Sequence, residues 1–228
     1  MTPVLQASDN ALANAAKAAL AWTHSARFLT TASRLDQLPA SELPEIAFVG
    51  RSNAGKSTAI NRLAQQKRLA FASRTPGRTQ HINLFEVGPK DAPDALFADL
   101  PGYGYAAVER AAKLRWQEVM ADYLQSRRSL HGVVLMIDSR LGFTDLDRRL
   151  LEWLAPRLGG GQVRLLALLT KADKLNRRDA QAALQAAQAL LGEVAPEGAD
   201  IGVTLFSALS RQGLADVAEV LHGWALPS

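Results

Sequence analysis

Eight consecutive residues after a short apolar run could hold the phosphates of a nucleotide. They read Gly50-Arg51-Ser52-Asn53-Ala54-Gly55-Lys56-Ser57 and match the G-x-x-x-x-G-K-[ST] phosphate loop at every fixed position. Gly50 and Gly55 permit backbone conformations that a side chain would block, so successive N–H groups can point at phosphates. Lys56 would reach the terminal phosphates, and the Ser57 hydroxyl would ligate Mg²⁺ bound to them.

A carboxylate followed by a glycine ends a later apolar run. The segment is Asp99-Leu100-Pro101-Gly102. Asp99 would hold the Mg²⁺ shell through water, and the Gly102 N–H could sense the terminal phosphate. A lone D-x-x-G sequence is usually a turn, but its place behind a phosphate loop favours the functional interpretation.

Two further segments could read a base. Thr170-Lys171-Ala172-Asp173 directly follows a buried apolar run, and Phe206-Ser207-Ala208 follows the last one. Asp173 could accept both the ring N–H and the exocyclic amine of guanine, whereas adenine lacks that pair of donors. The stem of Lys171 would lie along the base, and a backbone N–H of the last segment could bind the guanine oxygen. These segments predict GTP rather than ATP as the ligand.

The segment from residue 73 to 80 reads SRTPGRTQ and supplies a further hydroxyl. Thr79 is the candidate that would complete Mg²⁺ coordination when a terminal phosphate is present, and Thr75 is the alternative. The Pro76-Gly77 pair fits a turn in a mobile loop.

Charge in this region has one sign. From Arg51 through Phe85 there are seven basic residues and no acidic one. One nucleotide can use only part of this charge, so the surplus indicates a polyanionic partner such as RNA. A patch that is merely solvated is the alternative interpretation.

Short apolar runs that alternate with helical patterns must position these motifs. Six runs are typical of strands: Ile46 to Val49, His81 to Val87, Ala95 to Leu100, Val133 to Ile137, Leu165 to Leu169 and Ile201 to Phe206. Most gaps between them are long enough for a helix, which favours an α/β fold with a mainly parallel sheet and helices on both faces. The link from Gly88 to Asp94 has no room for a helix and predicts one antiparallel strand.

Composition restricts the class of protein further. The 228 residues carry a net charge of +4, with 48% hydrophobic and 21% charged residues, which excludes disorder and coiled coil. The absence of cysteine excludes disulfides, thiolate zinc sites, iron–sulfur clusters and cysteine catalysis. No apolar stretch approaches the length of a membrane span, so we expect a cytoplasmic protein. We further expect an Ala-rich helical extension over residues 1–25, a polar connection to about residue 40, and one domain over residues 26–228, with monomer as the default state.

The combination of GRSNAGKS, TPGRTQ, DLPGYG, TKAD and FSAL closely resembles the bacterial EngB family, also called YihA or YsxC, of translation-factor-type GTPases. The resemblance covers roughly Ala26 to Leu221. It implies a Ras-like domain that binds GTP or GDP with Mg²⁺ and acts in assembly of the large ribosomal subunit. It also implies a need for the protein in normal cell division and septation.

The resemblance carries over residue by residue. It implies phosphate contacts at Gly50 to Ser57 and base contacts at Thr170 to Asp173 and Phe206 to Ala208. The first switch would be Gly77-Arg78-Thr79-Gln80-His81, followed by the element Asp99 to Gly102. Mg²⁺ ligands would be Ser57 and Thr79, with Asp99 acting through water. Lys56, Thr79 and Gly102 are the predicted catalytic residues.

Two positions depart from the residues that are usual in the wider GTPase class, and a third matches only some of its members. Thr170 replaces the asparagine of N-K-x-D, so that the loop-bridging amide is lost. Tyr103 stands where many small GTPases have a water-orienting glutamine, and a phenol is a poor substitute. Asn53 resembles the asparagine that helps some related GTPases hold K⁺, although an asparagine that tolerates the loop geometry is an equally good interpretation.

These features predict a slow GTPase that switches between two surfaces on a ribosomal precursor. One alternative is a GTPase that acts directly in septum formation as an interaction protein. A P-loop kinase is the third reading, but no arginine-rich lid insertion is visible in the sequence.

Overall fold

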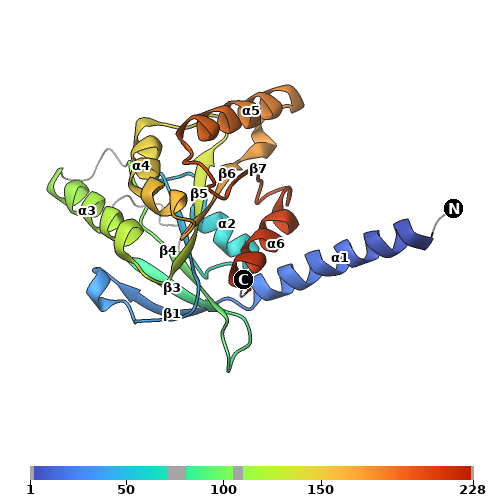
Figure 1. The fold of residues 1–228 in the computed structure, drawn as a ribbon, viewed down its shortest axis with the longest axis horizontal. Helices are drawn as coiled ribbons and strands as arrows, with labels where there is room; N and C mark the ends of the chain where they lie inside the picture. The colour runs from blue at the N-terminus through green and yellow to red at the C-terminus, as the bar shows by residue number, and fades with distance from the viewer. Residues whose placement is uncertain (1–2, 71–80, 105–109, 227–228) are drawn as a thin grey trace.

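A single mixed sheet forms the centre of the molecule (Figure 1). The computed structural model describes residues 3–70, 81–104 and 110–226. In this part of the chain seven strands follow the order β1-β3-β4-β2-β5-β6-β7. Their bounds are β1 Arg27–Ala32, β2 Glu45–Gly50, β3 Ile82–Val87, β4 Ala95–Asp99, β5 Leu130–Asp138, β6 Arg164–Thr170 and β7 Ile201–Leu205.

The direction of the strands confirms the predicted α/β class. Strands β4, β2, β5, β6 and β7 pair in parallel, whereas β3 is antiparallel to both of its neighbours, β1 and β4. One strand therefore runs against the rest, because the link from Gly88 to Asp94 is too short for a crossover helix.

Helices cover both faces of the sheet. The α-helices are α1 Pro3–His24, α2 Lys56–Leu63, α3 Arg110–Ser126, α4 Asp145–Gly159, α5 Arg177–Val194 and α6 Leu214–Ala225, with short 3₁₀ helices η1 Leu35–Gln37 and η2 Ala172–Lys174. Helices α1, α2 and α6 contribute to one hydrophobic core, and α3, α4 and α5 to the other. Strand β2 serves both cores, since Ile46 and Phe48 face the first and Ala47 and Val49 face the second. Its continuous apolar run is the pattern expected of a strand covered on both faces.

The prediction of a polar connection between the first helix and residue 40 was wrong in part. Residues Arg27–Ala32 form β1, which pairs with β3 from Arg27 opposite Glu86 to Ala32 opposite Ile82. This edge strand is stabilised by pairing with a distant segment rather than by a local hydrophobic pattern, which explains why it was missed.

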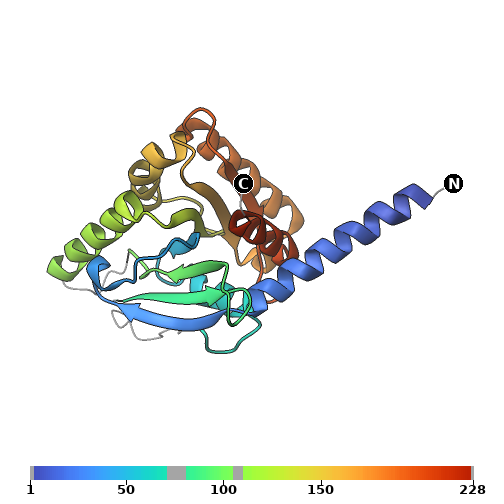
Figure 2. The same ribbon diagram turned by 60° about the horizontal axis from the view of Figure 1, so that its bottom comes forward.

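The predicted Ala-rich helix is α1, which extends away from the body of the molecule toward the N-terminus (Figures 1 and 2). Near its C-terminal end, Ala19 and Trp22 are buried in the core shared with α2 and α6. The domain boundary after residue 25 stays a prediction.

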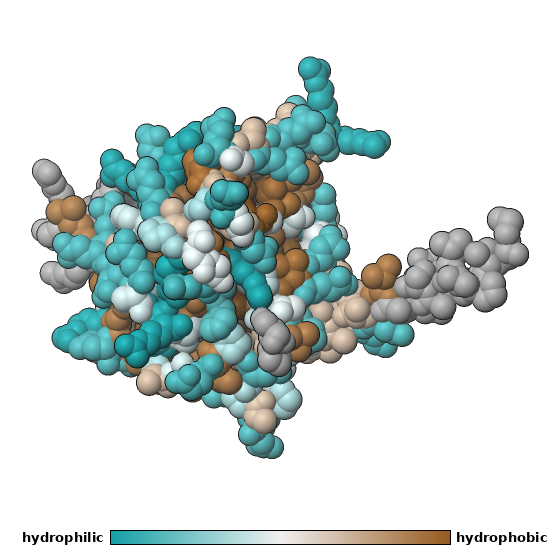
Figure 3. Space-filling view, in the orientation of Figure 1, coloured by the Kyte–Doolittle hydropathy of each residue, from teal (hydrophilic) through white to brown (hydrophobic). Residues whose placement is uncertain are grey.

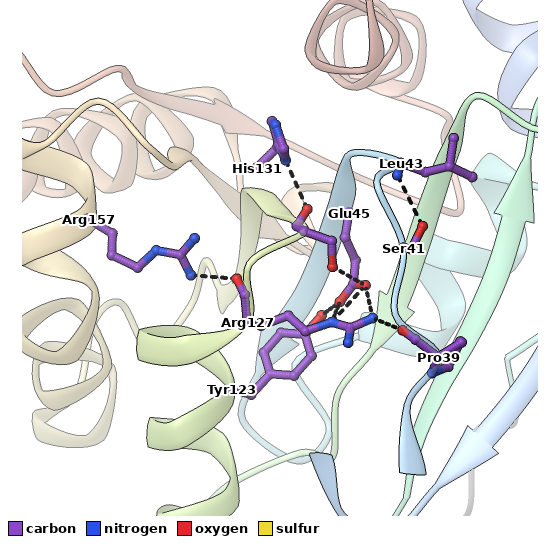
Figure 4. Close-up of polar contacts among 9 residues, drawn as sticks. Pro39, Ser41, Leu43, Glu45, Tyr123, Arg127, His131 and Arg157 are labelled. Carbon is purple, nitrogen blue, oxygen red and sulfur yellow. Dashed lines mark hydrogen bonds and ion pairs between the residues drawn. The ribbon is translucent and has the colours of Figure 1, made fainter. Parts of the chain in front are cut away.

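A buried polar cluster closes one end of the sheet (Figure 4). Glu45, at the start of β2, is fully buried and accepts hydrogen bonds from Tyr123, Arg127 and Ser129. Arg127 also donates to the carbonyl of Pro39 at 2.9 Å. The carboxylate is thus both paired and hydrogen-bonded, as a buried charge must be. The described residues of the predicted functional motifs lie at the opposite end, where the parallel strands β2, β4, β5, β6 and β7 finish.

Candidate functional site

The phosphate loop connects β2 to α2, in the strand–loop–helix context that the motif requires. At Gly50 a Cβ atom would lie 2.8 Å from the Cβ of Met136, so only glycine lets β2 run this close to β5. Gly55 has a φ of +92°, and Asn53 has a φ of +66°. Asparagine tolerates this left-handed conformation, which is what the loop-geometry interpretation of Asn53 requires. A role of Asn53 in holding K⁺ stays a prediction.

Lys56 and Asp99 meet at the base of this loop. The Lys56 ammonium donates a hydrogen bond to the Asp99 carboxylate, and the two side chains are only 8% and 1% exposed. The start of α2 and the end of β4 therefore bring together the cation predicted for the terminal phosphates and the carboxylate predicted for the metal shell. A nucleotide phosphate would compete with Asp99 for the ammonium.

The donors present fit Mg²⁺. Ser57 and Asp99 offer oxygen atoms, which are the ligands that this ion prefers, and Mg²⁺ commonly binds through one or two side chains together with substrate phosphates. No cluster of three or more His, Cys, Asp or Glu side chains suited to a metal occurs in the described residues.

The segment after β4 lies directly on the phosphate loop. The Tyr103 N–H donates to the carbonyl of Gly50 at 3.2 Å, and the Ser52 N–H donates to the carbonyl of Tyr103 at 2.8 Å. Leu100 and Pro101 are buried, whereas Gly102 is exposed. A Cβ on Gly102 would lie 3.2 Å from the Ser52 nitrogen, so this approach is close enough to require adjustment by any larger residue.

The Tyr103 phenol donates a 2.6 Å hydrogen bond to Asp147 at the start of α4. Burial and the nearby Asp147 carboxylate raise the pKa of Tyr103 well above its ordinary value. The phenol is thus a protonated donor that is already engaged by a carboxylate.

Thr170 preserves a bridge that the sequence predicted to be lost. Its hydroxyl donates to the carbonyl of Ala54 in the phosphate loop at 2.6 Å and lies 3.1 Å from the carbonyl oxygen of Ile137. The amide is absent, as predicted, but the hydroxyl links the base-reading segment to the phosphate loop. The next residue adds a second link, since the Lys171 ammonium donates to the carbonyl of Asn53 at 2.7 Å.

Asp173 and Ser207 form the predicted base-reading end of the site. The Ser207 hydroxyl donates to Asp173 at 2.6 Å and lowers the pKa of that carboxyl below its ordinary value. The Ala172 N–H also donates to the carbonyl of Phe206, and Arg62 on α2 donates to the carbonyl of Ala208. Asp173 therefore remains an ionised acceptor in a loop braced by the segment after β7.

Sequence reasoning missed Asp138, the last residue of β5. Its carboxylate accepts hydrogen bonds from Arg140 and from the Lys171 ammonium, and these bonds hold the pKa of Asp138 well below its usual range. Arg51, Asp138 and Arg140 also line a pocket of about 190 Å³ beside the phosphate loop. The available sequence signal was that Asp138 directly follows the predicted strand Val133 to Ile137. In the structure, Asp138 pairs with Thr170 on the neighbouring strand β6.

Part of the predicted first switch lies outside the described residues. This applies to Gly77, Arg78, Thr79 and Gln80, and to the alternative candidate Thr75. His81 is described: it is exposed, and its Nδ1 lies 2.8 Å from the Ser33 hydroxyl after β1.

Comparison with known proteins places this geometry in context. The family model described as "50S ribosome-binding GTPase" matches residues 45–171, which is more than half of the chain. The probable GTP-binding protein EngB of Acidovorax ebreus (strain TPSY) is 57% identical over 208 residues, covering 91% of this chain and 92% of that protein. The protein of the same name from Polaromonas sp. (strain JS666) is 57% identical over 212 residues, covering 93% and 83%.

Among solved structures, the chain is similar to the crystal structure of a probable GTP-binding protein EngB. The TM-score is 0.58 at 20% identity, over 79% of this chain and 98% of that one. This likeness confirms the expected Ras-like fold. None of the helices in the described part of the chain combines the length and the apolar character that a membrane span requires.

Proposed function

The chain belongs to the EngB family of GTP-binding proteins, and from this premise we propose that it is a slow GTPase switch in assembly of the large ribosomal subunit. The observation that carries the proposal is the arrangement of charged groups on the side of the sheet where the parallel strands end. Lys56 and the phosphate loop follow β2, and the ionised acceptor Asp173 follows β6.

Lys56 would leave Asp99 for the terminal phosphates when GTP binds. The bound Mg²⁺ would neutralise phosphate charge, held by the Ser57 and Thr79 hydroxyls and by Asp99 through water. Backbone N–H groups of the phosphate loop and of Gly102 would fix the terminal phosphate for in-line attack by water. The new P–O bond forms as the bond to the bridging oxygen breaks, giving GDP and inorganic phosphate.

Low intrinsic turnover is part of the proposal. The residue after Gly102 is Tyr103, and its phenol is engaged by Asp147 instead of being free to orient water. Catalysis would therefore depend on positioning and charge neutralisation alone. Hydrolysis in the tens per second without a partner would contradict this account.

The partner is proposed from charge and family. Exposed Lys67 and Arg68 follow α2 within the segment of seven basic residues. The face in Figure 3 is largely hydrophilic, with hydrophobic residues scattered among polar ones. The seven basic residues suit contact with ribosomal RNA, and the family model that matches the chain is described as ribosome-binding. Failure of ribosome supply would then account for a requirement in cell division and septation.

Base selectivity tests the nucleotide site. The purified protein should bind fluorescent GDP at least a hundredfold more tightly than fluorescent ADP, because only guanine offers Asp173 two donors. Asp173→Asn should weaken GDP binding and improve binding of xanthosine diphosphate, whose ring carbonyl can accept from the new amide. Equal binding of GDP and ADP by the unchanged protein would overturn the guanine assignment.

A further inference from the structure

Tyr103 is anchored at three atoms, two of them to the phosphate loop and the third to α4. Its N–H and carbonyl bond to Gly50 and Ser52 of the phosphate loop, while its phenol reaches Asp147 on α4. The peptide that joins Gly102 to Tyr103 therefore has little freedom to move. The Gly102 N–H belongs to the preceding peptide, which lies between this anchored residue and the buried Pro101.

Asp147 is a fixed partner for the phenol. It is fully buried, and one carboxylate oxygen accepts the Tyr103 hydroxyl at 2.6 Å. The other oxygen accepts the N–H and the hydroxyl of Thr144, each at 2.7 Å. Thr144 is the N-cap residue of α4 and forms a capping box with Asp147, and the same carboxylate has a second role that capping does not require.

We propose that the Tyr103–Asp147 hydrogen bond positions the Gly102 N–H for the terminal phosphate, which makes Tyr103 a positioning residue for GTP over GDP. This inference rests on the proposed function. Only GTP carries a γ-phosphate, so only GTP gains from a Gly102 N–H that is already in place. Without the phenol–carboxylate bond, only the two backbone hydrogen bonds to the phosphate loop restrain Tyr103. The remaining ordering must then occur when GTP binds, and that cost falls on GTP and not on GDP.

The test compares the affinities of a non-hydrolysable GTP analogue and of GDP, measured with Mg²⁺ by titration calorimetry. Tyr103→Phe keeps the ring and removes the hydroxyl. The variant should lose about fivefold in affinity for the analogue, the size expected for one hydrogen bond, while its affinity for GDP changes less than twofold.

The chain offers a matched control at the other end of the sheet. Tyr123 is also buried and also donates its phenol to a buried carboxylate, that of Glu45 (Figure 4). Tyr123→Phe removes the same kind of bond and should lower thermal stability without changing the ratio of the two affinities. A merely structural role of Tyr103 would make the two variants behave alike.

Asp147→Asn provides a second route if Tyr103→Phe does not fold, because it weakens the acceptor while retaining its shape. It should shift the ratio in the same direction, and the double variant should shift it no further than Tyr103→Phe alone. A ratio within twofold of the unchanged protein in the variants at 103 or 147, or an equal shift in Tyr123→Phe, would overturn the inference. If the unchanged protein bound neither nucleotide, the proposed function itself would fail.

Discussion

The hydroxyl of Thr170 is 2.6 Å from the carbonyl oxygen of Ala54, and this bond joins the end of β6 to the phosphate loop. Thr170→Val removes the hydroxyl while nearly preserving shape, and it leaves a buried carbonyl with one partner fewer. Without this bond the phosphate loop is held less firmly in place for the nucleotide, and we expect about a tenfold loss in affinity for fluorescent GDP, which corresponds to about 1.4 kcal/mol. Thr170→Ser keeps the hydroxyl and should bind GDP nearly as the unchanged protein does; equal losses in both variants would contradict the bridge.

The motif residues of the site could be predicted because each belongs to a recognisable motif that follows a predicted strand. The Thr170 bridge could not, because whether a short hydroxyl reaches Ala54 depends on the spacing between two segments that are distant in the sequence. Asp138 was missed for the same reason, since its role depends on Arg140 and Lys171 converging on it.

Asp173 should give guanine binding a defined dependence on pH. The Ser207 hydroxyl lowers the pKa of Asp173, so the ionised acceptor persists as the pH falls and is lost only below the ordinary range of a carboxyl. Ser207→Ala should raise this pKa, so that GDP affinity declines at a higher pH than in the unchanged protein. Equilibrium titrations from pH 7 to pH 3.5 would measure the shift, within the range where circular dichroism shows both proteins folded. Superimposable pH profiles would contradict it.

At the scale of elements, the β3–β4 hairpin joins the predicted first switch to Asp99. The segment that links α1 to β1 contacts the turn of this hairpin. The Trp22 indole donates to Asp94 at 2.7 Å, and the Gly88 N–H donates to the Ser25 hydroxyl at 2.7 Å. Arg27 pairs with Glu86 and donates to the carbonyl of Gly88. These contacts join the C-terminal end of α1 and the start of β1 to the hairpin.

Trp22→Phe tests this contact. Phenylalanine can retain the edge-on packing that Trp22 makes with Phe97, but it cannot donate to Asp94. We expect the free energy of unfolding to fall by about 1 kcal/mol, measured by urea denaturation. In a double-mutant cycle with Asp94→Ala the two losses should not add; full additivity would show that the hydrogen bond contributes nothing.

The alternation of strands and helices was sufficient to predict the α/β class and the single reversed strand, because crossover length dictates direction. It was not sufficient for β1. Phe28 and Leu29 of this strand are exposed at the sheet edge, so the segment lacks the buried alternation that marks an internal strand.

At the scale of the whole molecule, the two ends of the sheet have different tasks. The end with Glu45 and Arg127 holds a fully paired charge cluster, whereas the other end gathers the phosphate loop, Asp99 and Asp173, where the γ-phosphate of GTP would bind under the proposed function. Binding or loss of that phosphate would thus alter one surface while the rest of the fold stays fixed. Under the proposed function, this change in one surface would make binding of a partner depend on the nucleotide.

Sedimentation with isolated large ribosomal subunits tests this central claim most directly. The protein would be mixed with subunits at moderate salt in the presence of a non-hydrolysable GTP analogue, GDP or no nucleotide. The account predicts co-sedimentation with the analogue and not with GDP, and loss of that binding in Thr79→Ala. Sedimentation that is the same in all three nucleotide states, with guanine nucleotide binding intact, would contradict a switch that acts on the large subunit.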